Sequence, residues 1–338
     1  MKKQILLTTF IALSSFASAS LVDDAKKAGL SPIPTEKNEL MKLIDNSKNP
    51  ITDAKVALGK ALFFEPRLSK SNLISCNTCH NLATGGIDGV SVAIGHKWSS
   101  NPHHLNSPTV YNSVFMERQF WDGREPDLEA QAQGPMQAAP EMAISKEMAV
   151  KRISSMAGYK KQFKDAFGDD KITFKKIADA IGVFERTLVT PSKFDKFLAG
   201  DTKALSTKEQ EGLKTFIAKG CTACHTGVGV GGGMQKFPLV KPYKYANIGD
   251  FKGDKNGMVK TPTLRNISQT APYFHNGAVW SLDEAVKIMG ETQLGVELNN
   301  KEVESIVTFL KALDGDMPTI IYPKLPSVTD TTPKPEVD

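Results

Sequence analysis

The sequence has little cysteine, no long apolar run beyond its first 19 residues and no dense cluster of lysine and arginine. A membrane-spanning helix needs about 20 predominantly apolar residues, so the chain after residue 19 predicts none. The formal net charge is +5, and 40 basic residues face 37 acidic ones once Lys2 and Lys3 are set aside. This mild excess gives no reason to expect a nucleic-acid partner. Convincing runs of alternating polar and apolar residues are also missing, which argues against a sheet-based fold.

The first 19 residues, MKKQILLTTFIALSSFASA, have the layout of a secretory signal peptide. Two lysines precede an apolar run and an A-S-A cleavage site ends it, so the mature chain is expected to start at Ser20. A membrane anchor is a poorer interpretation, because the apolar stretch is short and 1–19 contains five hydroxyl residues. No cysteine near the cleavage site offers a point for lipidation. We therefore expect an exported protein in the periplasm, without a membrane anchor.

All four cysteines belong to two C-x-x-C-H motifs that stand 145 residues apart. Disulfides are common in exported proteins, C-x-x-C pairs can be redox-active, and paired C-x-x-C motifs can hold zinc. Zinc pairs, however, usually stand about 15–20 residues apart. None of these interpretations explains a histidine directly after the second cysteine in both motifs. Covalent c-type haem explains it, since two thioethers fix the haem and the adjacent histidine reaches the iron. The predicted haem-binding residues are Cys76, Cys79 and His80, and Cys221, Cys224 and His225.

The letters GVGVGG at 227–232 match the G-x-G-x-x-G fingerprint of dinucleotide sites. That fingerprint must follow a strand and open a helix. Here it follows the second C-x-x-C-H motif and runs into another glycine, so we predict a loop.

Apolar residues at helical spacing predict a mainly α-helical protein. One predicted helix begins with a Ser-x-x-Glu capping box at 206–209 and stops at Gly220. Others begin at Thr173, Ser281 and Asn300; the first of these is expected to close at Pro191.

Each haem motif with a helix before it indicates one cytochrome c-like domain, so we expect two such domains joined near Thr190-Pro191. The expected boundaries are an N-terminal extension at 20–44, a first domain at 45–190, a second at 191–325 and a disordered tail at 326–338.

Several longer stretches carry more information than the two short motifs. They are ISCNTCHNLATGGIDGVSVAIGHKW, NSPTVYNSVFMERQFWDGREPDLEAQAQGPM and PEMA in the first half, and GCTACHTGVGVGG, KTPTLRNISQTAPYFHNGAVWSLDEAVKIMG and QLG in the second. Together they resemble the bacterial dihaem cytochrome c peroxidases. The similarity covers about residues 45 to 315. It implies two packed haem domains with a calcium site at their junction.

The resemblance also implies an axial ligand set for each iron. The first, low-potential haem would have His80 as proximal ligand and His96 as a removable distal ligand. The second, high-potential haem would be bound by His225 and Met289, and thioether ligation favours reduced iron. Related MauG-type enzymes carry a tyrosine at the position of Met289. Without the resemblance, His96 would be a structural histidine and Met289 a core residue.

Further roles follow from the same resemblance. Trp121 would lie between the haems as a bridge for electrons, although a core tryptophan is the plainer interpretation. Glu141 would be the acid–base group beside the open iron, with Gln131 next to it; without the family, Glu141 would be a charge at a helix start. His275 would lie near a haem propionate. The implied calcium ligands are Asn106, Thr270 and Pro272, which offer an amide oxygen and two backbone carbonyls.

Together with the signal peptide, the resemblance implies a periplasmic enzyme that reduces hydrogen peroxide to water. Two electrons would come from a small cytochrome c or a cupredoxin, and a homodimer is the family expectation. Two alternatives stay open. A purely electron-transferring dihaem cytochrome would keep both irons six-coordinate, and a MauG-like enzyme would oxidise a protein side chain.

Overall fold

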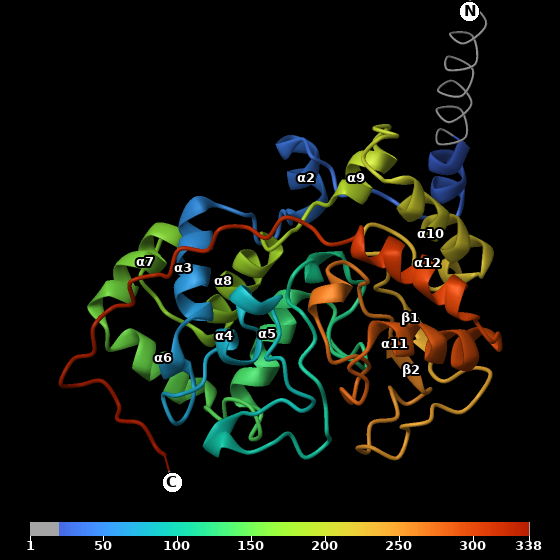
Figure 1. Ribbon diagram of the computed structural model, residues 1–338. Coiled ribbons are helices and arrows are strands. Elements are labelled where there is room, and N and C mark those ends of the chain that lie inside the picture. The colour runs from blue at the N-terminus through green and yellow to red at the C-terminus, as the bar shows by residue number, and fades with distance from the viewer. Residues whose placement is uncertain (1–19, 338) are drawn as a thin grey trace, which may run out of the picture.

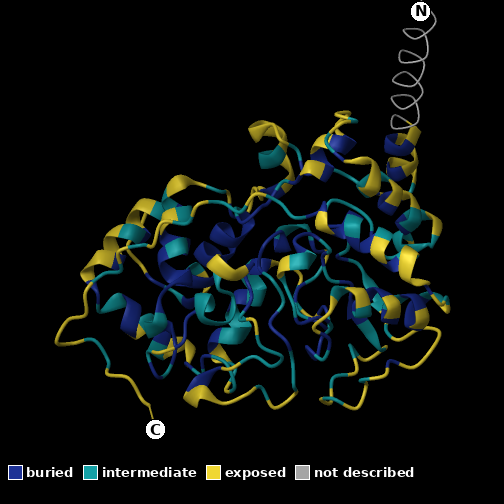
Figure 2. Ribbon diagram, viewed as in Figure 1, coloured by how far each residue is buried: buried dark blue, intermediate teal, exposed yellow. Residues whose placement is uncertain are grey.

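The computed structural model describes residues 20–337, so the predicted signal peptide at 1–19 lies outside the described residues. Figure 1 shows two helical lobes side by side, one from the first half of the chain and one from the second. Buried residues gather inside each lobe, as Figure 2 shows, and form two separate large apolar cores. The predicted fold class, two mainly helical domains, is confirmed. Among the described residues, no helix has the length and apolarity needed to cross a bilayer.

The first domain is built around one central helix, α8. Its helices are α3 (Asp53–Phe63), α4 (Cys76–Cys79), α5 (Leu128–Gln137), α6 (Lys146–Ser154), α7 (Ala157–Phe167) and α8 (Phe174–Arg186). Helix α8 packs against α3 and α5. It is capped by Thr173 as predicted, but it ends at Arg186, short of Pro191. At the α3–α8 crossing a Cβ on Gly59 would lie 1.9 Å from the Ala180 carbonyl oxygen, so only glycine allows this approach.

The second domain pairs helices in the same manner. Its helices are α9 (Lys193–Leu198), α10 (Thr207–Ala218), α11 (Leu282–Met289) and α12 (Asn300–Lys311), and a π-helical turn at Gly290–Leu294 follows α11. The capping box at 206–209 is confirmed, and Ser281 caps α11. The last helix is capped by Asn299, one residue before the predicted start. Where α10 crosses α12, a Cβ on Gly212 would lie 2.2 Å from the Ser305 carbonyl oxygen.

Short elements connect these helices. Strands β1 (Met234–Lys236) and β2 (Met258–Lys260) pair antiparallel, a hairpin that the sequence did not predict. Three residues per strand are too few to show an alternating pattern, which explains the omission. The glycine-rich segment 227–232 leads into β1 and opens no helix, as expected of a loop. The 3₁₀ turns are Pro66–Leu68, Leu82–Thr84, His96–Trp98, Ser113–Phe115, Cys221–Ala223 and Ile267–Gln269.

The two domains contain a repeated backbone unit, at 106–130 and 260–284. Asn112 and Asn266 begin matching 3₁₀ turns with φ of 60° and 58°. Both side-chain amides donate to the hydroxyl oxygen of Thr190, at 2.7 and 2.8 Å. The repeats therefore meet at one buried residue at the boundary between the domains.

The same repeat places Trp121 opposite His275. Each follows a phenylalanine in the left-handed region, Phe120 and Phe274, both with φ of 68°. A glycine with positive φ follows two residues later in each copy. Trp121 and His275 are thus counterparts, and their ring centroids lie 6.4 Å apart.

The N-terminal extension is bound to both domains. Residues 20–27 are helical and contribute Leu21 and Val22 to the core of the second domain. The Ile33 amide then donates to Asp195, which forms a fully buried ion pair with Arg265 at 2.8 Å. Helix α2 (Lys37–Ile44) follows.

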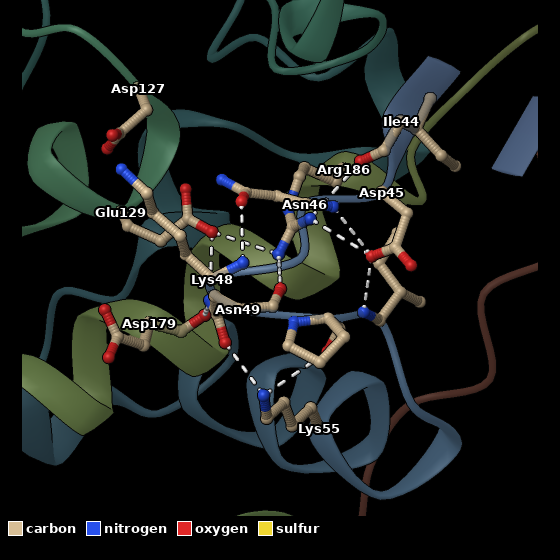
Figure 3. A network of polar contacts seen from close by, with 12 residues as sticks. Ile44, Asp45, Asn46, Lys48, Asn49, Lys55, Asp127, Glu129, Asp179 and Arg186 are labelled. Carbon is tan, nitrogen blue, oxygen red and sulfur yellow. Dashed lines mark hydrogen bonds and ion pairs between the residues drawn. The ribbon is translucent and has the colours of Figure 1, made fainter. Parts of the chain in front are cut away.

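A polar network fixes the chain after α2 to the first domain (Figure 3). Asn49 donates to Glu129 of α5 at 2.9 Å and accepts from Lys55 of α3 at 2.9 Å. Arg186 of α8 pairs with Glu129 at 3.0 Å and with Asp45 at 3.6 Å. Four segments are thereby joined through side chains that are mostly buried.

The C-terminal segment differs from the expectation of a disordered tail. Residues 326–337 are described, and after α12 the chain crosses from the second domain onto the first (Figure 1). Arg152 donates to the Lys334 carbonyl at 3.0 Å, and the Glu336 amide donates to the Lys70 carbonyl at 3.0 Å. Amino-acid composition does not predict this packing, because a buried arginine binds the backbone of the tail and not its side chains.

Candidate functional site

A cavity of about 1000 Å³ lies between the two domains, and both C-x-x-C-H motifs line it. Helices α5 and α8 contribute walls from the first domain, and α11 and α12 contribute walls from the second. This volume is at the upper end for small-molecule sites. The two motifs, far apart in sequence, therefore open into one shared space.

The first motif occupies a single helical turn, α4. Ser75 and Thr78 form a capping box that fixes this turn. His80 follows directly, and its Nδ1 lies 3.0 Å from the Pro108 carbonyl oxygen. Because a carbonyl can only accept, Nδ1 carries the proton and Nε2 is left to bind a metal.

The second motif repeats this arrangement on a 3₁₀ turn. Gly220, with φ of 85°, reverses the chain after α10 and places Cys221 at the start of the turn. His225 is buried, and its Nδ1 lies 3.3 Å from the Val230 carbonyl oxygen. Burial lowers the pKa of His225 to about 4, which keeps the ring in the neutral form that binds metals.

These residues fit two covalent haems. No disulfide joins the four cysteines among the described residues, and all four line the cavity. Burial raises the pKa of Cys79 to about 12 and that of Cys221 to about 11, so the thiols are neutral. Each motif supplies two thiols and one oriented imidazole, the full set that c-type attachment needs.

His96 lies beside the cavity and does not line it. Its backbone amide donates to the Glu141 carbonyl at 2.7 Å. The side chain is buried, and within the described residues its Nδ1 has no hydrogen-bond partner. Of the four predicted iron ligands, His80, His225 and Met289 line the cavity, with Met289 as the last residue of α11.

Glu141 and Gln131 both line the cavity near the first motif. Gln131 lies on α5, and Glu141 lies in the turn between α5 and α6. Burial raises the pKa of Glu141, although Arg124 opposes the shift. A carboxyl group in this position can hold a proton closer to neutral pH than an exposed one.

The cavity has a first half, lined by the first C-x-x-C-H motif, and a second half, lined by the second motif. Trp121 is buried on the cavity wall between these two halves. Its indole N–H donates to the Asn106 carbonyl at 3.0 Å, and the Asn106 amide donates to the His275 carbonyl at 2.8 Å. His275 also lines the cavity, and burial lowers its pKa to about 4. Trp121 and His275 are therefore held by a common partner.

The predicted calcium ligands Asn106, Thr270 and Pro272 all line this cavity. The Asn106 side-chain amide nitrogen donates to the Val90 carbonyl at 2.9 Å, which leaves its amide oxygen as the ligating atom. The described residues contain no group of three or more His, Cys, Asp and Glu side chains suited to a metal ion. Calcium here would rest on neutral oxygens, which fit a hard cation.

Two buried, charged cavity residues escaped the sequence analysis. Lys260 is buried, and burial lowers its pKa to about 8. Glu185 is buried too, and burial followed by the charge of Glu129 raises its pKa to about 8. A signal existed for Glu185, since it stands at i+4 from Ile181 on the apolar face of α8.

Comparison with known proteins adds family information. A family model described as di-haem cytochrome c peroxidase matches residues 53–203, and a cytochrome c model matches 209–314. The cytochrome c551 peroxidase of Nitrosomonas europaea is 49% identical over 82% of this chain and 85% of its own length. That of Pseudomonas aeruginosa is 43% identical over 94% of both chains.

More distant relatives include methylamine utilization protein MauG of Methylorubrum extorquens, 34% identical over 82% of this chain and 83% of its own. Among solved structures, a MauG-like protein associated with microbial copper homeostasis superposes with a TM-score of 0.71 and 28% identity. That match covers 80% of this chain and 92% of the other.

Proposed function

The chain belongs to the di-haem cytochrome c peroxidase family and is a cytochrome-c peroxidase with two c-type haems. We propose the following roles for its residues in binding the haems and in reducing peroxide. The observation that carries the proposal is the shared cavity: both C-x-x-C-H motifs line it, and Glu141 lies on the wall of the first half. When bound, the first haem supplies the iron that takes peroxide, and the second supplies a store for one electron.

In the first half, His80 is the permanent ligand and His96 the removable one. The Pro108 carbonyl fixes the His80 ring, which supports a permanent role. His96 stands on a 3₁₀ turn outside the cavity lining, and its neighbours Lys97 and Trp98 have positive φ of 60° and 55°. Non-glycine residues in this region are strained, which supports a turn with two arrangements.

Glu141 acts as the acid–base group of the reaction. Peroxide must lose a proton on binding, and its outer oxygen must gain one to leave as water. The Glu141 carboxyl can accept the first proton and return it, a role typically worth 10²–10⁴-fold in rate. Gln131 faces the same space from α5 and can orient the peroxide by hydrogen bonding.

In the second half, His225 and Met289 hold the electron-storing haem. Thioether ligation raises the reduction potential of an iron centre, which suits a site that accepts electrons and passes them on. Trp121 lies between the halves and serves as the bridge. The roles of Cys76, Cys79, Cys221 and Cys224 are the covalent attachments.

Calcium at Asn106, Thr270 and Pro272 would couple the halves. Asn106 is bonded to Trp121 and to His275, one residue from each copy of the repeated unit. A cation bound there would fix the relative position of the two repeats. We propose that bound calcium fixes the two repeats in this way, and that the fixed arrangement supports the movement of the His96 turn.

The remaining proposals concern the protein's surroundings. The donor is a small cytochrome c or a cupredoxin, the location is the periplasm, and the assembly is a homodimer. The relatives named cytochrome c551 peroxidase support a cytochrome donor.

Haem-loaded protein tests the proposal directly. It should contain two haems per chain and oxidise a reduced cytochrome c in proportion to added peroxide. A Cys221→Ser, Cys224→Ser variant should lose the second haem and this turnover. Half-reduction with calcium should turn the first haem from low-spin to high-spin. A first haem that stays low-spin, together with absent turnover, would favour a purely electron-transferring cytochrome.

A further inference from the structure

A row of aromatic rings leads from the cavity wall to the protein surface. Trp121 and His275 lie 6.4 Å apart between ring centroids, His275 and Tyr243 lie 6.0 Å apart, and Tyr243 and Tyr245 lie 5.8 Å apart. Trp121 and His275 line the cavity, whereas Tyr245 is half-exposed. We name these four residues the aromatic exit. Tryptophan and tyrosine are the ring side chains that give up an electron most readily.

The two tyrosines have different hydrogen-bond partners. Tyr243 is buried, and its hydroxyl donates to the amide oxygen of Asn276 at 3.0 Å. An amide oxygen does not take a proton at ordinary pH, and burial raises the pKa of Tyr243. With no acceptor for its phenolic proton, Tyr243 does not hold the oxidation and serves only as a short-lived relay to Tyr245.

Tyr245 has a proton acceptor. Its hydroxyl donates to a carboxylate oxygen of Glu284 at 3.0 Å, and Lys244 pairs with the same oxygen at 2.5 Å. Hydrogen bonds from Lys244 and then Tyr245 lower the pKa of Glu284, so the carboxylate is ionised. Since a tyrosine releases its phenolic proton on oxidation, the oxidation is trapped at Tyr245.

We propose that the aromatic exit carries an oxidising equivalent from the cavity to Tyr245 when no donor protein is present, and that small one-electron reductants of the ene-diol class discharge it there. This inference rests on the proposed function. It adds a second outlet for oxidising power, at the surface of the second domain.

The electrons and atoms balance. Peroxide needs two electrons and two protons to become two waters. The half-reduced protein supplies one electron from its store, and Tyr245 supplies the other through Tyr243, His275 and Trp121. The phenolic O–H bond breaks, its proton goes to Glu284 and on to solvent, and a neutral tyrosyl radical remains. An ene-diol then donates one hydrogen atom to the phenoxyl oxygen, which restores Tyr245 and leaves the ene-diol radical.

The alternative is that these rings only pack. Tyr243 belongs to a small core under α11, and Tyr245 packs against that core. A packing role would be visible in thermal stability and would leave radical chemistry unaffected. The test must therefore detect the radical itself.

The experiment mixes half-reduced, haem-loaded protein with peroxide in the absence of donor cytochrome and freezes it for EPR. Protein made with ring-deuterated tyrosine should show a radical signal of altered hyperfine structure, which identifies tyrosine. We expect at least tenfold less radical in Tyr245→Phe and in Tyr243→Phe. Ascorbate should speed the decay of the wild-type signal at least tenfold.

Tyr322→Phe is the matched control. Tyr322 is 71% exposed and packs on Phe64 at 4.8 Å, and no ring contact within residues 20–337 joins it to Trp121. Tyr322→Phe should leave the radical yield unchanged. Tyr245→Phe should leave cytochrome-dependent turnover unchanged. A signal that survives in Tyr245→Phe, or falls equally in Tyr322→Phe, overturns the inference alone. Loss of all peroxide reaction in wild-type protein, with or without cytochrome, overturns the proposed function and this inference with it.

Discussion

Glu141 is the residue on which the proposed proton transfer depends. Glu141→Gln keeps the shape and a polar head but cannot exchange a proton near neutral pH. The variant should bind both haems and still open its first site on half-reduction. Peroxide turnover should nevertheless fall at least about 100-fold, within the usual range for acid–base assistance. Stopped-flow kinetics on half-reduced, calcium-loaded protein measures this.

That form of the protein is needed so that a failure to open cannot resemble a failure of proton transfer. Turnover close to wild type would remove Glu141 from its role and leave Gln131 or a water as the acid–base group. Loss of opening together with turnover would make Glu141 a support for the His96 turn, whose amide it already binds through its carbonyl.

Met289 tests the identity of the second iron's ligand. Met289→His replaces a thioether with an imidazole and should lower the potential of the second haem by more than about 100 mV. Haem content and fold should be retained, and physiological donors should then reduce the protein poorly. Redox titration followed by optical spectra gives the potential. An unchanged potential would make Met289 a packing residue of α11.

Glu185 predicts a dependence of stability on pH. Its folded pKa of about 8 lies above the ordinary 4.5, so the folded protein holds this proton more tightly than the unfolded chain. Ionisation of Glu185 therefore lowers the free energy of unfolding. The loss is absent below pH 4.5, grows as the pH rises, and is complete above about pH 8. Glu185→Gln should be more stable than wild type at pH 8, by a few kcal/mol at most, about 1.4 per pKa unit.

Thermal unfolding of haem-loaded protein between pH 4.5 and 8 measures the difference. Glu147→Gln, an exposed change on α6, is the control for removing a negative charge. A stability difference that does not grow with pH would mean that Glu185 is ionised and paired in the haem-loaded protein.

Among the elements, the helices were the most predictable part. Capping residues are local signals, so Ser206 and Thr173 identified two helix starts directly. The β1–β2 hairpin was missed because its pairing depends on contacts with distant chain, including the Lys260 amide donating to the Trp121 carbonyl. The burial of Lys260 could not be predicted either, because no local sequence pattern indicates which loop faces a cavity.

The site residues also fall into two groups, those that a local sequence pattern predicts and those that it does not. Cysteine count and spacing indicated both haem motifs without any relative. The roles of His96, Glu141 and Met289 came from the resemblance, because a single histidine, glutamate or methionine carries no pattern of its own. The structure brings Glu141 and Met289 to the cavity and leaves His96 beside it.

The His96 turn is the element predicted to move. Gly95 permits its present position, since a Cβ there would lie 2.1 Å from the Pro140 carbonyl oxygen. His96→Gly removes the proposed ligand and leaves the backbone contact to Glu141 in place. The fully oxidised variant should then react with peroxide without prior reduction, as optical spectra would report. If the variant still requires reduction, another group closes the first iron.

At the scale of the whole molecule, the C-terminal tail connects the second domain to the first. It supplies the Lys334 carbonyl to Arg152, a fully buried guanidinium on α6. Arg152 also donates to the Lys70 carbonyl at 3.0 Å, and the Lys70 amide donates to the Met142 carbonyl at 2.8 Å, next to Glu141. The tail thus stabilises the loop that carries the active-site wall.

Deletion of 326–338 should therefore destabilise the first domain. The deletion removes two charge-assisted hydrogen bonds, from Arg152 to the Lys334 carbonyl and from Arg67 to the Pro326 carbonyl at 2.8 Å. Each should be worth about 1.5–3 kcal/mol, so the melting temperature should fall by several degrees or more. Lys334→Ala should change little, because Arg152 contacts the backbone carbonyl and not the lysine side chain. Glu336→Ala removes an exposed ion pair with Lys70, worth no more than about 1 kcal/mol. Calorimetry of the three haem-loaded variants makes the comparison. Equal melting temperatures for wild type and the deletion would show that the tail does not hold the first domain, and a large loss in Lys334→Ala would show that the side chain, rather than the backbone, makes the contact.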